Sequence, residues 1–162
     1  GYTLSWTNRQ FENVNFGQWY PYKYDRRHDI SVVLTHKINS NWDFSFTWSY
    51  GTGNAITFPQ QLYLSNPQTS FNYYQNSYVE LIESYGERNS TRMQAYHRLD
   101  IGFTHTKKKN KFDRIISFGA YNAYNRKNPF FAYLSYDLNG NRVARQVSLF
   151  PVIPSVSYRI KF

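Results

Sequence analysis

The chain has 162 residues, enough for one ordinary domain, and its formal net charge is +9 at pH 7. Aromatic residues make up 20% of the sequence, charged residues make up only 18%, and cysteine is absent. This composition excludes disulfide bonds, thiolate catalysis and cysteine metal sites within these residues. No run approaches the roughly 18 consecutive apolar residues of a membrane-spanning helix.

The first predicted strand covers roughly residues 1–11. Its alternation is already under way at Gly1, with Tyr2, Leu4 and Trp6 on one face, and no signal peptide precedes it. Because an exported protein needs such a peptide, we expect either that it has been removed or that the chain is part of a longer one. We favour the second interpretation.

The next two strands are predicted on either side of a short polar turn at 39–41. The second strand covers roughly 27–38. The third, from Trp42 to Tyr50 and Gly51, has the clearest pattern, since every even position is aromatic and every odd position is polar or glycine. Its length matches the roughly 9–11 residues that cross a hydrocarbon layer at a tilt.

The connections at 12–26 and 53–95 are long, whereas the turns at 39–41 and 107–113 are short. Outer-membrane barrels have short periplasmic turns and long extracellular loops, so we expect 53–95 to be extracellular. Tyrosine supplies rigid contact area and a hydroxyl at low entropic cost. The candidate ligand-binding residues are therefore the loop tyrosines, unless they pack the loop on itself: Tyr63, Tyr73, Tyr74, Tyr78 and Tyr85.

The fourth strand is predicted over roughly 96–106, where Arg98 and Asp100 share the polar face and are expected to form an ion pair. The basic turn that follows, 107–113, is expected to lie near phospholipid headgroups. Its lysines also fit a nucleic-acid tract, but the basic residues are scattered over strand ends and form no recognised nucleic-acid motif. We expect no nucleic-acid partner.

A fifth strand begins near Arg114 and is expected to bend at 125–129, because proline cannot donate to a strand ladder, and to resume over 130–137. Asn139 and Gly140 are a strong hairpin signal. The sixth strand runs from about 142 to 162, with bends at Pro151 and Pro154.

The last eight residues alternate strictly, with Val156, Tyr158, Ile160 and Phe162 on one face and only polar residues on the other. In a soluble sandwich the apolar face would meet a core, and in an outer-membrane barrel it would meet lipid. Six strands cannot close a barrel, for which about eight are needed. Partner strands must then come from upstream in the same polypeptide or from other subunits.

Nothing in the sequence indicates an enzyme. It contains no zinc-protease spacing, no glycine-rich phosphate loop and no nucleophile elbow. His28, beside Asp29, could serve in acid–base or metal chemistry, but a polar strand end at the outer rim fits better. We expect no catalytic residues, no metal and no cofactor.

Several segments together resemble the C-terminal end of TonB-dependent outer-membrane transporters of Bacteroidetes-type bacteria. They are residues 24–29, 48–54, 85–89, 96–100, 121–130 and 148–155, and the resemblance spans nearly the whole chain. The block Tyr-Asn-Ala-Tyr-Asn-Arg at 121–126 resembles the penultimate-strand signature of the family.

The resemblance implies an all-β, antiparallel transmembrane β-barrel of 22 strands, of which residues 1–162 would form about the last six. The plug domain and TonB box would lie outside these residues. Tyr158, Ile160 and Phe162 resemble the barrel-assembly signal. The implied function is import of a nutrient across the bacterial cell outer membrane with energy from the inner membrane.

The implied partners are outer-membrane lipid and lipopolysaccharide, the barrel assembly machinery, and TonB through the N-terminal part. A surface lipoprotein lid remains an open question. Two alternatives also remain open. One is a soluble secreted β-domain that binds glycans through aromatic residues, and the other is a channel in which several short chains share one barrel.

Overall fold

The computed structural model describes residues 1–64 and 81–162, and it is an all-β, antiparallel structure apart from one short 3-10 helix, η1 (Asn15–Gly17). The chain divides into two compact units. Unit 1 contains residues 1–6, 26–54 and 93–162, and unit 2 contains residues 7–25 and the described part of 55–92. No helix among the described residues has the length and apolarity needed to cross a membrane.

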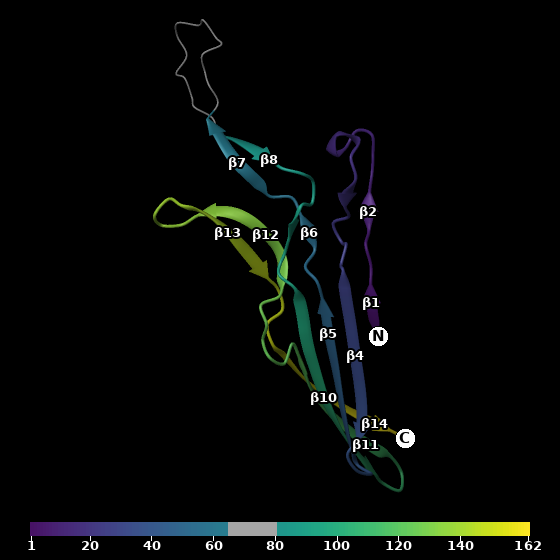
Figure 1. Ribbon diagram of the computed structural model, residues 1–162. Coiled ribbons are helices and arrows are strands. Elements are labelled where there is room, and N and C mark those ends of the chain that lie inside the picture. Colours follow the sequence, from purple (N-terminus) through teal and green to yellow (C-terminus); the bar gives the residue numbers. More distant parts are fainter. Residues whose placement is uncertain (65–80) are drawn as a thin grey trace, which may run out of the picture. The chain divides into compact units, whose positions relative to one another are not determined.

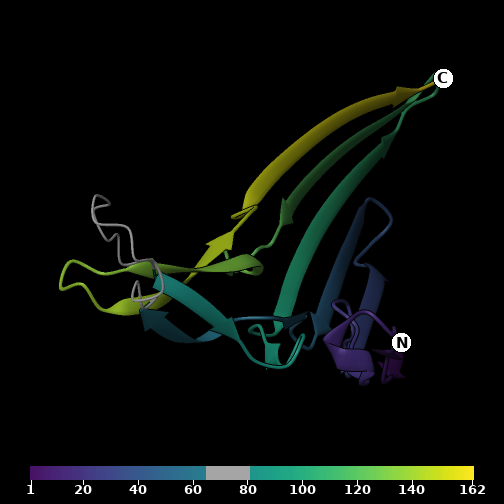
Figure 2. The same cartoon turned by 90° about the horizontal axis from the view of Figure 1, so that it is seen from above.

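Unit 1 is built on one six-stranded antiparallel sheet, which we call the main sheet. In spatial order its strands are β1 (Tyr2–Leu4), β4 (His28–Lys37), β5 (Trp42–Gly51), β10 (Tyr96–Lys108), β11 (Asp113–Tyr121) and β14 (Ile153–Lys161). Figure 1 shows β4, β5, β10 and β11 side by side, and Figure 2 shows β10, β11 and β14 curving together. The predicted third strand has the bounds observed for β5, and the predicted second and fourth strands differ from β4 and β10 by one or two residues at their ends.

The register of the main sheet gathers the apolar side chains on one face, which we call the apolar face. Residues directly opposite each other on paired strands point to the same side. One row that crosses five strands runs His36, Phe44, Phe103, Phe118 and Val156. The neighbouring row toward the long connections runs Leu34, Phe46, Ile101, Ala120 and Pro154. The alternation predicted separately for each strand therefore becomes one continuous surface.

Nothing among the described residues of unit 1 covers this face. Val32 is 43% exposed, Phe118 46% and Val156 72%. In the whole described part of the chain, only two apolar side chains are buried, Tyr20 and Ala55, and both belong to unit 2. The main sheet consequently has no apolar core of its own.

The opposite face, which we call the polar face, carries serine and glycine over four strands of its middle row. Ser45, Gly102, Gly119 and Ser155 are opposite one another across four strands. A Cβ on Gly102 would lie 2.9 Å from the Ser45 Oγ, so a larger side chain there would displace its neighbour. The small side chains leave room above this row for whatever the polar face contacts.

The predicted fifth and sixth strands are each broken, at the bend predicted over 125–129 and at the bend predicted at Pro151, whereas the bend predicted at Pro154 lies within a strand. β11 ends at Tyr121 and β13 (Arg142–Ser148) ends before Pro151, and β12 (Pro129–Tyr136) pairs with β13 in a separate two-stranded sheet. The predicted Asn139-Gly140 hairpin turn lies at the tip of this sheet, with Gly140 at φ +78°. Pro154 lies in β14, which pairs only with β11 among the described strands and so tolerates a residue with no N–H.

Unit 2 holds the two long connections together. The connection 53–95 contains β6 (Ala55–Ile56), β7 (Pro59–Leu64), β8 (Leu81–Tyr85) and β9 (Thr91–Arg92). The first predicted strand is divided into β1 and β2 (Asn8–Arg9), and β2 pairs with β3 (Tyr20–Pro21) in unit 2. A loop with its own strand pairs is therefore present where the sequence predicted a large surface loop.

Asp25 is the centre of unit 2 and is fully buried. Its Oδ1 accepts a hydrogen bond of 2.6 Å from the Thr7 backbone N–H. The guanidinium of Arg92 pairs with the other carboxylate oxygen and also donates to the Asp25 carbonyl. Removing Arg92 would leave the buried Asp25 carboxylate uncompensated, so this pair holds residues of both long connections in place.

The β12–β13 hairpin tip yields a prediction about pH. The backbone and side chain of Asn141, together with the Asn139 backbone, donate to the Asp137 carboxylate and lower the pKa of Asp137 below its ordinary value of 3.8. A lowered pKa means that the ionised carboxylate stabilises the folded tip. This contribution is complete above 3.8 and is lost as the pH falls through the lowered pKa.

We expect the amide signals of Asn139 and Asn141 to shift together, with a midpoint below 3.8, in an NMR titration of the assembled protein. Asp137→Asn should abolish the shift, and Asp43→Asn, outside the hairpin, should leave it intact. A midpoint at or above 3.8 would contradict the role assigned to this carboxylate.

Candidate functional site

The candidate site lies on the polar face, at the end of β10 and β11 that leads to the long connections. Tyr96, Arg98 and Asp100 follow at alternate positions of β10 and therefore share this face. Tyr121, the last residue of β11, follows Gly119 by two residues and therefore lies on the same face. The predicted pair is present, with the Arg98 Nη2 2.9 Å from the Asp100 Oδ2.

Arg98 organises the site. Its Nη1 donates to the Tyr121 hydroxyl at 2.7 Å and to the Tyr96 hydroxyl at 3.1 Å. Its guanidinium carbon also lies 4.2 Å from the centre of the Tyr121 ring, a cation–π geometry. Both hydroxyls accept from Arg98, and they also share a hydrogen bond with each other.

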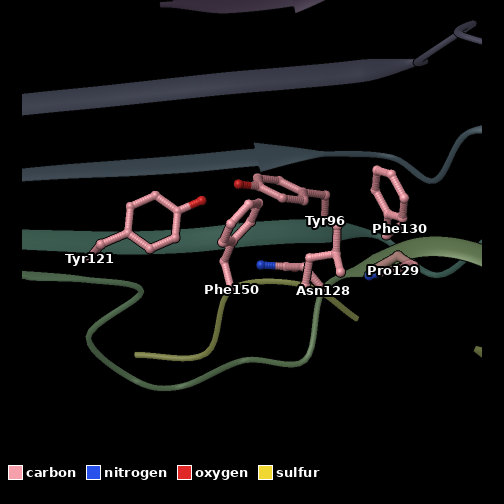
Figure 3. Close-up of a pocket in the computed structure, with 7 residues that line it drawn as sticks. Tyr96, Tyr121, Asn128, Pro129, Phe130 and Phe150 are labelled. Atoms are coloured by element: carbon pink, nitrogen blue, oxygen red, sulfur yellow. The ribbon is translucent and has the colours of Figure 1, made fainter. Parts of the chain in front are cut away.

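A pocket of about 240 Å³ opens beside these tyrosines. Figure 3 shows the Tyr96 and Tyr121 hydroxyls pointing toward each other, with the Phe150 ring beside them. The rings of Tyr121 and Phe150 meet edge to face with centroids 6.3 Å apart. The lining is mostly apolar and aromatic: Tyr96, Tyr121, Asn128, Pro129, Phe130, Leu149 and Phe150.

Phe150 reaches the pocket from an unusual backbone conformation. Its φ is +58°, a left-handed value that is rare for a bulky residue. The Asn122 side-chain amide donates to the Phe150 carbonyl at 3.1 Å and helps to hold this conformation. Strain of this kind persists only where the surroundings determine it, and it is concentrated at functional sites.

The turn at 121–126 is built around Asn122, which is 1% exposed and has a φ of +52°. Its side chain donates to the Arg126 carbonyl at 2.9 Å and accepts from the Arg126 backbone N–H at 3.0 Å. Its own backbone N–H donates to the Asp100 carboxylate at 3.0 Å. The Tyr-Asn-Ala-Tyr-Asn-Arg block therefore ends β11 and connects the site to the pocket wall.

Asn128 lines the pocket, and its side-chain amide pairs with the backbone of β10 as a neighbouring strand would. Its side chain accepts from the His97 backbone N–H at 3.0 Å and donates to the His97 carbonyl at 2.9 Å. These two bonds satisfy His97 where β10 begins. The amide thereby brings Pro129 and Phe130 to the pocket.

Of the five predicted ligand-binding tyrosines, the structure describes Tyr63 and Tyr85. Tyr63 and Tyr85 lie on the β7–β8 hairpin and are 52% and 56% exposed. Tyr63 is opposite Ile82. The Tyr85 hydroxyl donates to the carboxylate of Glu83, two residues earlier on β8, at 2.7 Å. Tyr73, Tyr74 and Tyr78 lie outside the described residues, so ligand contact by these tyrosines stays a prediction.

Other predicted residues have clear places. Tyr158 and Ile160 lie on the apolar face of β14, and Phe162 follows the strand, with its ring centroid 6.3 Å from that of Phe112. His28 begins β4 and shares a hydrogen bond of 2.9 Å with the Tyr2 hydroxyl. Within the described ranges, no three His, Asp or Glu side chains gather closely enough to hold a metal ion.

Sequence reasoning missed the pocket. The signal for half of it was present, because Tyr96 and Arg98 share a face and Tyr121 opens a distinctive block. The rest depends on Phe150, which follows β13 and reaches the site only through its left-handed backbone.

Comparison with known proteins finds no match: no protein-family model, curated protein or solved structure matches this chain. The functional assignment therefore depends on the two faces of the main sheet and on the residues of this pocket. A mostly apolar and aromatic lining with a few polar groups is typical of small-molecule binding pockets.

We predict that Asn122→Ala lowers the free energy of local unfolding of the pocket wall by about 2–4 kcal/mol, because it leaves buried backbone groups unpaired and places alanine at a positive φ. Hydrogen exchange should accelerate at 121–128 and 148–152 in the assembled protein. The control is Asn139→Ala in an exposed turn, which should change neither segment. Equal exchange in both variants would contradict the central role of Asn122.

Proposed function

We propose that residues 1–162 form part of the wall of a transmembrane β-barrel in the bacterial outer membrane. We further propose that the complete barrel is a TonB-dependent transporter that imports a nutrient. The observation that carries the first proposal is the uncovered apolar face of the main sheet. A barrel wall has an outward apolar face against lipid and an inward polar face against a wet lumen.

Histidines mark both ends of this apolar face. All 4 histidines of the chain lie on it, two on β4 and two on β10. His28 and His36 are eight residues apart, and so are His97 and His105. Eight residues correspond to roughly 26 Å along a strand, or roughly 22 Å in height at a tilt of about 35°, which is close to the band of about 25 Å on barrel walls.

The histidine positions also give a tilt. His28 lies beside Thr52, which follows β5, and His97 is opposite Tyr50 of β5. Measured along β5, the histidine at this end of the apolar face therefore shifts by two residues between β4 and β10. His36 and His105, opposite Phe44 and Trp42, show the same shift in the same direction. A shift of about 3.3 Å per strand spacing of about 4.8 Å is a tilt of about 35°, within the range of membrane barrels.

The rings around the histidines are those of membrane interfaces. The Tyr124 hydroxyl and His97 Nδ1 share a hydrogen bond of 2.7 Å at one end. Trp42 and His105 pack with ring centroids 4.7 Å apart at the other end. Amphipathic rings of this kind suit the boundary between hydrocarbon and water.

Strand and turn lengths support the same proposal. β4 and β5 have 10 residues each, and β11 and β14 have 9 each. These lengths match the roughly 9–11 residues of a membrane-crossing strand. Both short turns of the main sheet lie at one end, where the Thr106 backbone N–H donates to the Asn41 carbonyl at 2.7 Å, and the long connections leave from the other.

Both edges of the main sheet need partners in this setting. Among the described strands, β1 pairs only with β4, and β14 pairs only with β11. Each unpaired backbone group in hydrocarbon would cost several kcal/mol. We therefore propose that further strands of the complete protein continue the wall on both sides, and the family resemblance points to 22 strands in all.

In this proposal the polar face lines the lumen, and the Tyr96–Tyr121–Phe150 pocket lies at its extracellular end, where it would contact the imported ligand. The proposed partners are outer-membrane lipid and lipopolysaccharide, the barrel assembly machinery acting on the signal at Tyr158, Ile160 and Phe162, and TonB. The alternative of a soluble glycan-binding domain needs a second layer over the apolar face, and the described residues of unit 1 supply none.

The two faces of β5 provide the test. Phe46 is opposite Leu34 and Ile101 on the apolar face, and Thr47 is opposite Val33 and Asp100 on the polar face. We predict that Phe46→Arg in the full-length protein costs about 2–4 kcal/mol and lowers the amount assembled, whereas Thr47→Arg is tolerated. Membrane fractionation and heat-modifiability on gels measure both. Equal damage from the two substitutions would count against lipid at the apolar face.

Thiol labelling tests the orientation, since these residues contain no native cysteine. Asn139→Cys, at the β12–β13 tip, should react with a membrane-impermeant reagent on intact cells. Asn110→Cys, in the turn between β10 and β11, should react only after the outer membrane is permeabilised. The reverse pattern would invert the proposed topology.

A further inference from the structure

Two cations lie beside each other on the apolar face, at the end with the short turns. Lys107 and Arg114 are direct cross-strand partners on β10 and β11. Both are exposed. They occupy the row between His105, Ile116 and Tyr158 on one side and the contacting rings of Phe112 and Phe162 on the other.

The surroundings of this pair are apolar and aromatic. The guanidinium carbon of Arg114 lies 5.7 Å from the centre of the Tyr158 ring. Ile160 is the next cross-strand partner of Arg114 on β14. An anion held here would therefore lie beside an apolar surface that continues into Ile116, Phe118 and Val156.

The positive charge of this pair is uncompensated on its own face. No salt bridge among the described residues joins a carboxylate to Lys107 or Arg114. The nearest acidic side chain along β11, Asp113, is opposite Lys108 and Lys161 on the polar face. The same sheet end is therefore partly neutralised on one face and cationic on the other.

We propose that Lys107 and Arg114 bind the phosphate of an anionic glycerophospholipid whose acyl chains lie along the apolar face. This inference rests on the proposed membrane setting. Arginine offers a planar fork of donors to phosphate oxygens and lysine adds a compact charge, so the pair matches one phosphate group. Lipid with a net negative headgroup then binds here in preference to a zwitterionic lipid.

The experiment uses the full-length protein, purified in detergent from the membrane fraction. Phosphatidylglycerol is titrated, with phosphatidylcholine of the same acyl chains as the comparison, and bound lipid is counted by native mass spectrometry. Lys107→Gln with Arg114→Gln should weaken the anionic lipid by about 25-fold, since each interfacial charge contributes about fivefold. Phosphatidylcholine binding should not change.

The matched control is Lys108→Gln with Arg159→Gln, which removes two charges from the same sheet end on the polar face. It should keep the preference for phosphatidylglycerol. If the double variant assembles poorly, the single variants Lys107→Gln and Arg114→Gln should each lose about fivefold.

Equal losses in the two double variants would overturn the inference, because net charge and not this site would then set the preference. Equal affinity of the unmodified protein for both lipids would overturn it too, while its presence in the membrane fraction would leave the proposed wall intact. Recovery of the protein in the soluble fraction without detergent would overturn both proposals.

Discussion

The main sheet depends on one constraint, which is an unbroken antiparallel register from β4 through β5, β10 and β11 to β14. Side chains alternate between faces, so a slip of one residue in any of these pairings would move the aromatics of a strand to the polar face. The register shifts that do occur lie in the β7–β8 and β12–β13 pairs, outside the main sheet. The continuous apolar surface, its histidine limits and its two cations all follow from this register.

Buried polar side chains organise both units. At the margin of the main sheet, Asn122 connects β11 to the pocket wall and Asn128 pairs with the backbone of His97 as a strand would. Within unit 2, Asp25 ties together the long connections. Each of them makes at least two hydrogen bonds and is buried. A buried polar group is costly when unpaired and selective when paired, so these residues determine where strands end.

The sequence predicted whatever depends on local alternation and turn chemistry, and it failed where distant residues decide. Trp42–Gly51 could be bounded correctly because its pattern is uninterrupted, and the hairpin turn at Gly140 because few other residues adopt its φ. The end of β11 at Tyr121 could not be located, since Asn122 adopts a left-handed backbone whose side chain is satisfied by Arg126 and Phe150. The β6–β9 pairing likewise joins residues far apart in the chain.

The placement of polar groups on the apolar face favours lipid over a second protein layer as its neighbour. A second protein layer would cover an area set by its own shape, so the polar side chains of the sheet would begin at the edge of that area. A bilayer limits polar groups by depth alone, and in a tilted sheet a line of constant depth crosses successive strands with a constant offset. The histidines of β4 and β10 have equal separations and the same offset at both ends. Lys107 and Arg114 lie just beyond that line, where headgroup phosphates would begin.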